Sequence, residues 1–146
     1  MTKRILIMGL PGSGKSTLAH HLSLQLFPNV LWLNADEVRA QFDDWDFSLE
    51  GRLRQAQRMH DLADRSDKEY VICDFIAPLE QMREIFDADF TIWVDTIKES
   101  RFQNTDSIFQ PPRTYNFHVT EQNAVAVSKK IARHILEHIN TEHKIC

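Results

Sequence analysis

The hydrophobic positions of this chain form two kinds of pattern, which alternate along it. Short, nearly continuous apolar runs predict strands at residues 3–8, 30–34, 69–74 and 90–95, with a weaker fifth candidate at 114–119. Most of these runs lack the alternation with polar residues that a half-exposed strand shows. Such runs are typical of parallel strands that are buried on both faces.

The segments between these runs repeat their apolar residues every three or four positions, which predicts amphipathic helices. They cover residues 15–27, residues 48–66, a short stretch near Pro78 and a final stretch after Thr120. Ser48 and Thr120 have side chains suited to capping a helix N-terminus. The alternation predicts an α/β fold, a three-layer α/β/α sandwich with a parallel sheet of about five strands. Ligands bind such sheets at the carboxyl ends of the strands, so residues just after each strand are the functional candidates.

Length and composition narrow the class of protein. The 146 residues suit a single domain over 1–146, and the shares of hydrophobic (42%) and charged (26%) residues are ordinary for a globular protein. The net charge of −4 does not favour nucleic acid as a partner, although a polynucleotide end stays open as a substrate. Cys73 and Cys146 lack metal-ligand spacing and are interpreted as free thiols. No segment is long enough for a membrane span or a signal peptide, so we expect a cytoplasmic protein without a membrane partner.

The first predicted strand leads directly into a glycine-rich loop of nine residues. Its sequence, Gly-Leu-Pro-Gly-Ser-Gly-Lys-Ser-Thr, fits the phosphate-binding pattern G-x-x-x-x-G-K-[ST] at every fixed position. Lys15 can reach the β- and γ-phosphates, and Ser16 can place its hydroxyl on Mg²⁺. A glycine-rich turn that binds nothing is the alternative, and the strand–loop–helix context disfavours it. The residues predicted to bind ATP here are Gly9, Pro11, Gly12, Ser13, Gly14, Lys15, Ser16 and Thr17.

Carboxylates follow three of the other predicted strands. Asp36 comes after the second strand, where it could orient a substrate hydroxyl or take its proton; equally, it could cap a short helix. Asp74 ends the third strand, a position from which a carboxylate often orders Mg²⁺, although it could instead bind neighbouring backbone. Asp95 ends the fourth strand and is interpreted as a structural group.

Arginines and one aromatic residue add candidates for binding an acceptor. The predicted helix at 48–66 is rich in arginine, which usually means a solvated face, but Arg52 and Gln55 share a side that could face the site. Guanidinium suits phosphate or sulfate. Phe47 ends the acidic segment 43–47, which is a predicted loop, and there its aromatic ring could stack on a base. Trp32, in contrast, is interpreted as a residue of the hydrophobic core.

The order of these motifs resembles the adenylylsulfate kinase family, small P-loop kinases that phosphorylate the 3′-hydroxyl of adenosine 5′-phosphosulfate. Besides the loop, the family has Asp-Gly-Asp-x-x-Arg after the second strand, and residues 34–39 keep its second Asp and its Arg. A Phe-Ser pair leading into an arginine-bearing helix is matched at 47–58, with Gln55 in place of an Asn. Ile-Ala-Pro at 76–78 and Val-Asp-Thr at 94–96 are further matches, so the resemblance covers residues 3–96.

The resemblance implies roles for individual residues. Asp36 would be the base toward the 3′-hydroxyl, with Lys15 and Arg39 the other catalytic residues. Arg39 and Arg52 would hold the phosphosulfate, and Phe47 would stack on the adenine. The remaining substrate contacts would be Gln55 and the backbone of Ile76. The Mg²⁺ ligands predicted from the loop pattern and the strand ends are Ser16 and Asp74.

Beyond Thr96 the likeness to the family fades. Residues 97–118 form a shorter lid than the family's, and Arg101 is our prediction for a contact with the ATP adenine. The lid's candidate stacking aromatics are Phe102, Phe109, Tyr115 and Phe117.

We therefore expect a P-loop nucleoside triphosphate hydrolase fold and a Mg²⁺-dependent kinase that transfers the ATP γ-phosphate to a small hydroxyl-bearing substrate. Adenylylsulfate is the first-choice acceptor. A nucleoside, a nucleotide, a sugar or a polynucleotide end stays open, as does a nucleotide-binding module without an acceptor. The sequence also leaves a homodimer open.

Overall fold

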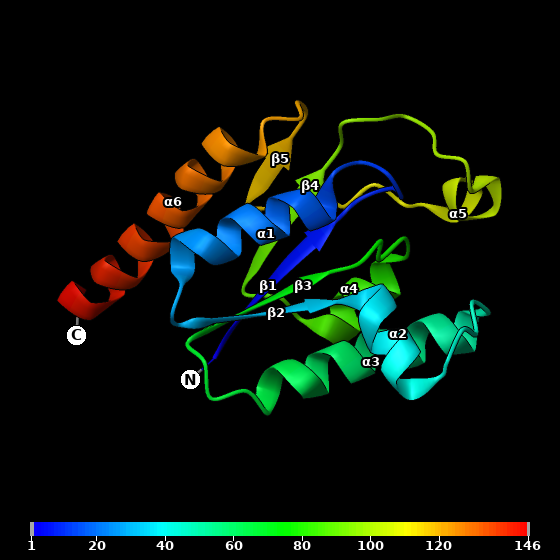
Figure 1. Cartoon of the computed structure of the whole chain (residues 1–146), viewed down its shortest axis with the longest axis horizontal. Helices are drawn as coiled ribbons and strands as arrows, with labels where there is room; N and C mark the ends of the chain where they lie inside the picture. Colours follow the sequence, from blue (N-terminus) through cyan, green and yellow to red (C-terminus); the bar gives the residue numbers. More distant parts are fainter. Residues whose placement is uncertain (1, 146) are drawn as a thin grey trace.

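The computed structural model describes residues 2–145, with side chains through residue 138, and five strands of this part form one parallel sheet (Figure 1). The strand order across the sheet is β2-β3-β1-β4-β5, and every neighbouring pair is parallel. The strands are β1 (Lys3–Met8), β2 (Val30–Asn34), β3 (Tyr70–Asp74), β4 (Phe90–Val94) and β5 (Phe117–Val119). Parallel pairing places the carboxyl ends of all five strands at the same edge.

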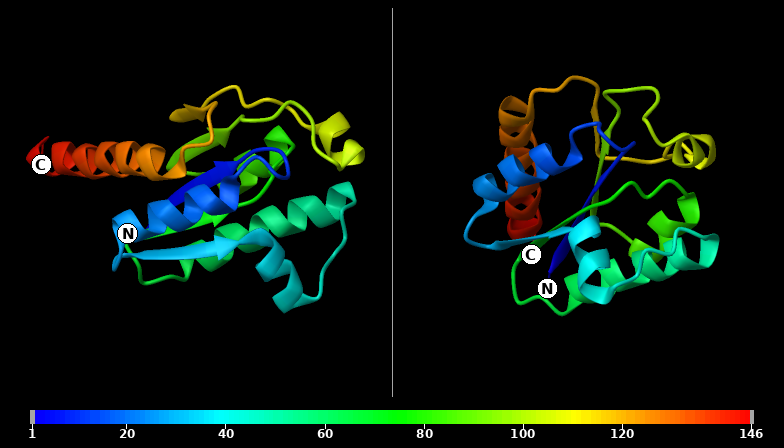
Figure 2. Two further views of the ribbon diagram at one scale, coloured as in Figure 1. Left: turned by 45° about the horizontal axis from the view of Figure 1, so that its top comes forward. Right: turned by 45° about the vertical axis from the view of Figure 1, so that its right-hand side comes forward.

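Helices cover both faces of this sheet, as the two views in Figure 2 show. Helices α1 and α6 pack together on one face, and α3 and α4 pack together on the other. The helices of the described part are α1 (Lys15–Leu26), α2 (Ala35–Phe42), α3 (Leu49–Asp64), α4 (Glu80–Phe86), α5 (Gln103–Ile108) and α6 (Ala124–Ile145). The prediction of a three-layer α/β/α sandwich is confirmed.

Strand β1 explains why the strands have continuous apolar sequences. Its side chains point alternately to the two faces, and both faces are buried. Ile5 and Ile7 pack with residues of α1 and α6, whereas Leu6 and Met8 pack with residues of α3 and α4. All four are at most 1% exposed, so a polar residue at any of these positions would lose its contact with water.

Some of the predicted ends of helices and strands agree with the structure, and others differ from it. Ser48 caps α3, because its hydroxyl accepts a hydrogen bond from the Gly51 N–H at 3.2 Å. Thr120 does not cap α6: the helix begins at Ala124, and the Asn123 carbonyl accepts its first bond, from the Val127 N–H. The predicted fifth strand shortens to three residues, and α4 begins two residues after Pro78.

The cysteine prediction concerns two different parts of the chain. Cys73 is a free thiol in β3, fully buried, and burial raises its pKa. Cys146 lies outside the described residues. None of the described helices combines the length and the apolar character that crossing a bilayer requires.

Candidate active site

The glycine-rich loop joins β1 to α1 at the carboxyl edge of the sheet. A Cβ atom on Gly9 would lie 2.2 Å from the Val94 carbonyl oxygen, so only glycine lets the loop pass this close to β4. Gly14 is the N-cap of α1 and has a φ of 105°, in the left-handed region that favours glycine. The unpaired N–H groups at the start of α1 therefore open toward the loop, which is the arrangement that binds phosphate.

Lys15 lies inside this loop. Its Nζ atom donates a hydrogen bond to the Leu10 carbonyl oxygen at 3.0 Å. Burial lowers the pKa of Lys15 to about 8, while the charges of Asp74 and Asp36 oppose that shift. The ammonium group is thus partly desolvated before a ligand arrives, and a bound phosphate would favour its charged form.

Asp74, at the end of β3, is held by donors from three directions. The indole Nε1 of Trp32 donates to Oδ2 at 2.6 Å, and the Asn34 amide nitrogen donates to both carboxylate oxygens at 3.2 Å. The Ser16 hydroxyl donates to Oδ1 at 3.4 Å. Burial raises the pKa of Asp74, and these hydrogen bonds oppose the shift. Trp32, interpreted from the sequence as core, therefore also orients a polar group of the site.

The same Asn34 side chain settles the alternative raised for Asp36. A short helix, α2, does follow β2, but its N-cap is Asn34, whose Oδ1 accepts from the Glu37 N–H at 3.1 Å. The interpretation of Asp36 as the cap is wrong. Asp36 instead lies exposed in the first turn of α2, where its side chain faces a cavity.

That cavity, which we call the Phe47 pocket, has a volume of about 730 Å³ and lies beside Pro11 of the loop. It brings together residues from segments that are far apart in the sequence. Its lining includes Asp36, Phe47, Arg52, Ile76, Arg101 and Phe102. A cavity that shares these residues continues inward to Lys15, Ser16, Arg39, Gln55 and Asp74.

Two buried arginines hold the loop that carries Phe47. Arg39 donates through Nη1 to the Asp44 and Asp46 carbonyl oxygens, and its guanidinium lies 4.3 Å from the centroid of the Phe47 ring. Arg52 donates through Nε to the Phe47 carbonyl oxygen at 2.8 Å. Burial lowers the pKa of both arginines. These bonds use only part of each guanidinium fork, so further N–H groups remain for an anionic ligand.

Gln55 lies deeper than the other predicted substrate contacts. It is 2% exposed, donates from Nε2 to the Ala35 carbonyl oxygen, and accepts from Arg58 Nη1 through Oε1. Its amide therefore ties α2 to α3. Arg58 and Arg54 both form ion pairs with Asp44, so these two arginines belong to a structural network rather than to the freely solvated face that an arginine-rich helix usually presents.

Arg101 and the candidate aromatic residues of lid segment 97–118 lie in different parts of the structure. Arg101 lines the Phe47 pocket, with its guanidinium 5.1 Å from the Phe102 ring centroid. Of the candidate aromatics, Phe102 lines this pocket, whereas Phe109 packs on the core beside α4. Tyr115 contacts Trp93 and His118, away from the pocket.

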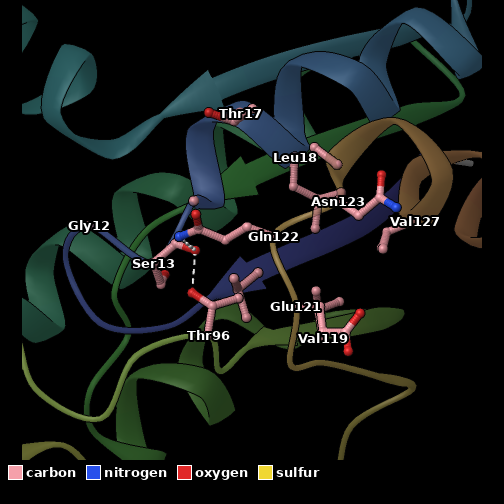
Figure 3. Close-up of a pocket in the computed structure, with 13 residues that line it drawn as sticks. Gly12, Ser13, Thr17, Leu18, Thr96, Val119, Glu121, Gln122, Asn123 and Val127 are labelled. Carbon is pink, nitrogen blue, oxygen red and sulfur yellow. Dashed lines mark hydrogen bonds between the residues drawn. The ribbon is translucent and has the colours of Figure 1, made fainter.

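A second cavity of about 430 Å³, the Gln122 pocket, is lined by the P-loop and by the residues just before α6 (Figure 3). The Thr96 hydroxyl donates to the Ser13 carbonyl oxygen at 2.6 Å, and the Gln122 amide donates to the same oxygen at 3.5 Å. Arg101 is not among the described residues that line this pocket. Sequence reasoning missed its polar residues Glu121, Gln122 and Asn123, although their place after β5 follows the rule that ligands bind at strand ends.

The oxygen ligands at the P-loop fit Mg²⁺. The Ser16 hydroxyl and the Asp74 carboxylate are hydrogen-bonded neighbours, and Mg²⁺ binds proteins through such oxygen ligands with the help of substrate phosphates. Asp36 also lies at the mouth of this cavity. The arrangement can thus hold a triphosphate, a divalent cation and a second molecule that approaches from the Phe47 pocket.

Comparisons with known proteins agree with this geometry. The model of the adenylylsulphate kinase family matches residues 1–119. A Mycobacterium tuberculosis APS kinase, solved in complex with AMPPNP and APS, is similar at 19% identity with a TM-score of 0.73, over 89% of this chain and 95% of that one. A shikimate kinase from Acinetobacter baumannii, solved with shikimate, is similar at 19% identity and a TM-score of 0.65, over 94% and 95% of the two chains.

A gluconokinase from Sinorhizobium meliloti shares the fold at 14% identity and a TM-score of 0.63, over 93% of this chain and 97% of that one. A search of curated proteins finds no significant match. The family match spans the P-loop, the carboxylates Asp36 and Asp74, and the Phe47 pocket. The chain is therefore an ATP-dependent phosphotransferase of the P-loop kinase class and belongs to the adenylylsulphate kinase family.

Proposed function

We propose that this protein transfers the γ-phosphate of ATP to the 3′-hydroxyl of adenosine 5′-phosphosulfate. One observation carries the proposal: the Phe47 pocket and the inner cavity that adjoins it combine two exposed phenylalanines, two buried arginines and one exposed carboxylate beside the P-loop. Aromatic rings suit a base, guanidinium groups suit a phosphosulfate, and a carboxylate suits a hydroxyl that must lose its proton. A flat, anionic acceptor with a free hydroxyl satisfies all three.

The residues divide the work of the transfer. Lys15 and the N–H groups of the P-loop stabilise the charge that develops on the γ-phosphoryl group. Asp36 accepts the proton of the 3′-hydroxyl. The oxygen of that hydroxyl forms the new bond to the γ-phosphorus, while the bond between this phosphorus and the oxygen that leaves with ADP breaks. Ser16 and Asp74 would hold Mg²⁺, which supplies charge neutralisation at the phosphates. Arg39 and Arg52 orient the acceptor for attack.

The Gln122 pocket is our proposal for the nucleoside of ATP. It borders Gly12, Ser13 and Gly14, whereas Pro11 lines the Phe47 pocket, so a triphosphate in the P-loop could extend its adenosine there. Donor and acceptor would then meet at Lys15 from opposite sides. In place of the sequence prediction for Arg101, we propose that this residue contacts the acceptor.

A different acceptor is the second candidate. Gln55 replaces an Asn of the resembled motif, and although it lines the inner cavity, its amide is already bonded to the Ala35 carbonyl oxygen and to Arg58. A direct contact between Gln55 and the acceptor would have to compete with these two bonds. Another anionic aromatic compound, such as a nucleotide, would satisfy the same rings and arginines.

A transfer assay with γ-labelled ATP separates these candidates. The acceptors to compare are adenosine 5′-phosphosulfate, AMP, adenosine, shikimate, gluconate and an oligonucleotide with a free 5′-hydroxyl. We expect label in the product from adenosine 5′-phosphosulfate alone, and its loss with Arg52→Ala. Label transferred to another acceptor and not to adenosine 5′-phosphosulfate would refute the proposed acceptor.

A further inference from the structure

Arg83, in the middle of α4, is buried and bonded to three different segments. Its Nε donates to the Ala77 carbonyl oxygen at 2.9 Å, its Nη1 to Glu80 Oε2 at 2.8 Å, and its Nη2 to the Gln110 carbonyl oxygen. Its guanidinium also lies 5.5 Å from the Phe109 ring centroid. A guanidinium at 8% exposure would be costly without such partners, so this one joins α4 firmly to the lid.

Gln110 makes the joint from the lid's side, although it is exposed. Its backbone N–H donates to the Pro78 carbonyl oxygen at 2.7 Å, and its side-chain Oε1 accepts from the Glu80 N–H at 2.8 Å. Together with the bond from Arg83, three hydrogen bonds hold one lid residue to the start of α4. The two prolines that follow it restrict the backbone further.

The lid residues before this joint form a closed unit. The Asp106 carboxylate accepts from both the N–H and the hydroxyl of Ser100, each at 2.6 Å, across the turn that carries Arg101 and Phe102. Asp106 therefore holds residues 100–106 together, and Gln110 fastens the segment to the start of α4. Arg101 and Phe102 line the Phe47 pocket together with Phe47 of the α2–α3 loop.

We propose that Arg83 and Gln110 are positioning residues for acceptor selection: they hold lid residues 100–110 against α4. Arg101 and Phe102 thereby form a wall of the Phe47 pocket that is already ordered before the acceptor binds. The proposal rests on the proposed function of that pocket. A wall that is ordered before the acceptor arrives removes the entropic cost of ordering it on binding. The Gln122 pocket shares no residue with residues 100–110, so the joint should leave ATP binding unaffected.

Hydrogen–deuterium exchange tests the joint without any acceptor. The Gln110→Ala variant should exchange the amides of residues 103–109 at least about tenfold faster than the wild type, because segments that lose tertiary contacts open more often. The P-loop and α3 should be unchanged. Gln57→Ala is the matched control, since Gln57 is an exposed glutamine that bonds within α3, to Asp61. Unchanged exchange in residues 103–109 would overturn the proposal.

Steady-state kinetics then test the role in selection. Gln110→Ala should raise KM for the acceptor about fivefold, with KM for ATP unchanged, as expected when side chains must be ordered on binding. Gln110→Glu keeps the Oε1 acceptor for the Glu80 N–H and should restore the wild-type KM. An equal rise in both KM values, or none in either, would overturn the positioning role. If no acceptor is phosphorylated, the proposed function fails while the exchange measurement still decides whether the joint exists.

Discussion

The two sides of the P-loop are built by different means. The phosphate site uses backbone groups of nine consecutive residues, shaped by glycines, with Lys15 inside them. The Phe47 pocket uses side chains from the α2–α3 region, the loop after β3 and the lid. On the proposed assignment, holding phosphate is a local property of the chain, whereas recognising an acceptor depends on the packing of distant segments. This contrast makes predictions that separate the two sides.

Removal of the Lys15 charge should have the largest effect. Lys15→Met should lower kcat/KM about a thousandfold, because a preorganised charge at the transferring phosphoryl group is lost. The assay is transfer from labelled ATP at saturating acceptor. Lys98→Met, which removes an exposed lysine of the lid, should keep wild-type activity. Equal rates in Lys15→Met and wild type would contradict the placement of phosphoryl transfer in this loop.

Asp36→Asn should have the next largest effect, confined to the acceptor step. We expect kcat to fall about a hundredfold, as for loss of a general base, with ATP affinity unchanged. The measurements are kcat at saturating substrates and a calorimetric ATP titration. Glu37→Gln changes the neighbouring exposed carboxylate in the first turn of α2 and serves as the control. Weaker ATP binding with unchanged kcat would move Asp36 to the nucleotide side and break the contrast.

The same contrast explains what the sequence could predict. The P-loop is contiguous, so its pattern and the preceding strand were enough to place it, and β1 has the predicted bounds. The acceptor residues Asp36, Phe47 and Arg52 do meet in one pocket, and the family resemblance grouped them before the structure did. Their roles remain predictions.

The positions of α5, Arg101 and the Trp32 indole have no local signal in the sequence. Helix α5 has no apolar periodicity and is held by the Asp106–Ser100 bonds and by the joint at Gln110, all of which depend on tertiary structure. The sequence prediction places Arg101 near the nucleotide because it follows β4, whereas its position in the Phe47 pocket depends on how the lid packs. Trp32 packs against the core, as interpreted, but an apolar run does not show that its indole N–H will meet a carboxylate.

Trp32 also offers a way to sharpen the contrast. Trp32→Phe removes the indole N–H that donates to Asp74 and should weaken Mg²⁺ binding in the nucleotide complex about tenfold, as for other partners of metal ligands. Mg²⁺-dependent nucleotide affinity is the measurement, and Trp45→Phe, at an exposed tryptophan, is the control. The expected loss would show that the Trp32 indole supports Mg²⁺ binding on the phosphate side through Asp74. No change in Mg²⁺ dependence would contradict that role of Trp32.

The smallest predicted effect is a pH dependence that only one side of the P-loop should show. With a pKa of about 8, Lys15 is half protonated at pH 8 and about a tenth protonated at pH 9. Phosphate binds the charged form, so ATP affinity should fall about fivefold between these values, while the γ-phosphate itself is already ionised. Arg39 and Arg52 stay protonated in this range, because guanidinium does not lose its proton in proteins. Acceptor affinity, titrated separately, should therefore stay level.

Lys15→Arg supplies the control, since its ATP affinity should not depend on pH over the same interval. A fall in acceptor affinity with level ATP binding would reverse the assignment of the two sides. A parallel fall in both would mean that a group shared by the two pockets titrates instead of Lys15. One result agrees with a desolvated Lys15 ammonium inside the P-loop: ATP affinity declines as the pH rises in the wild type, and this decline is absent in Lys15→Arg.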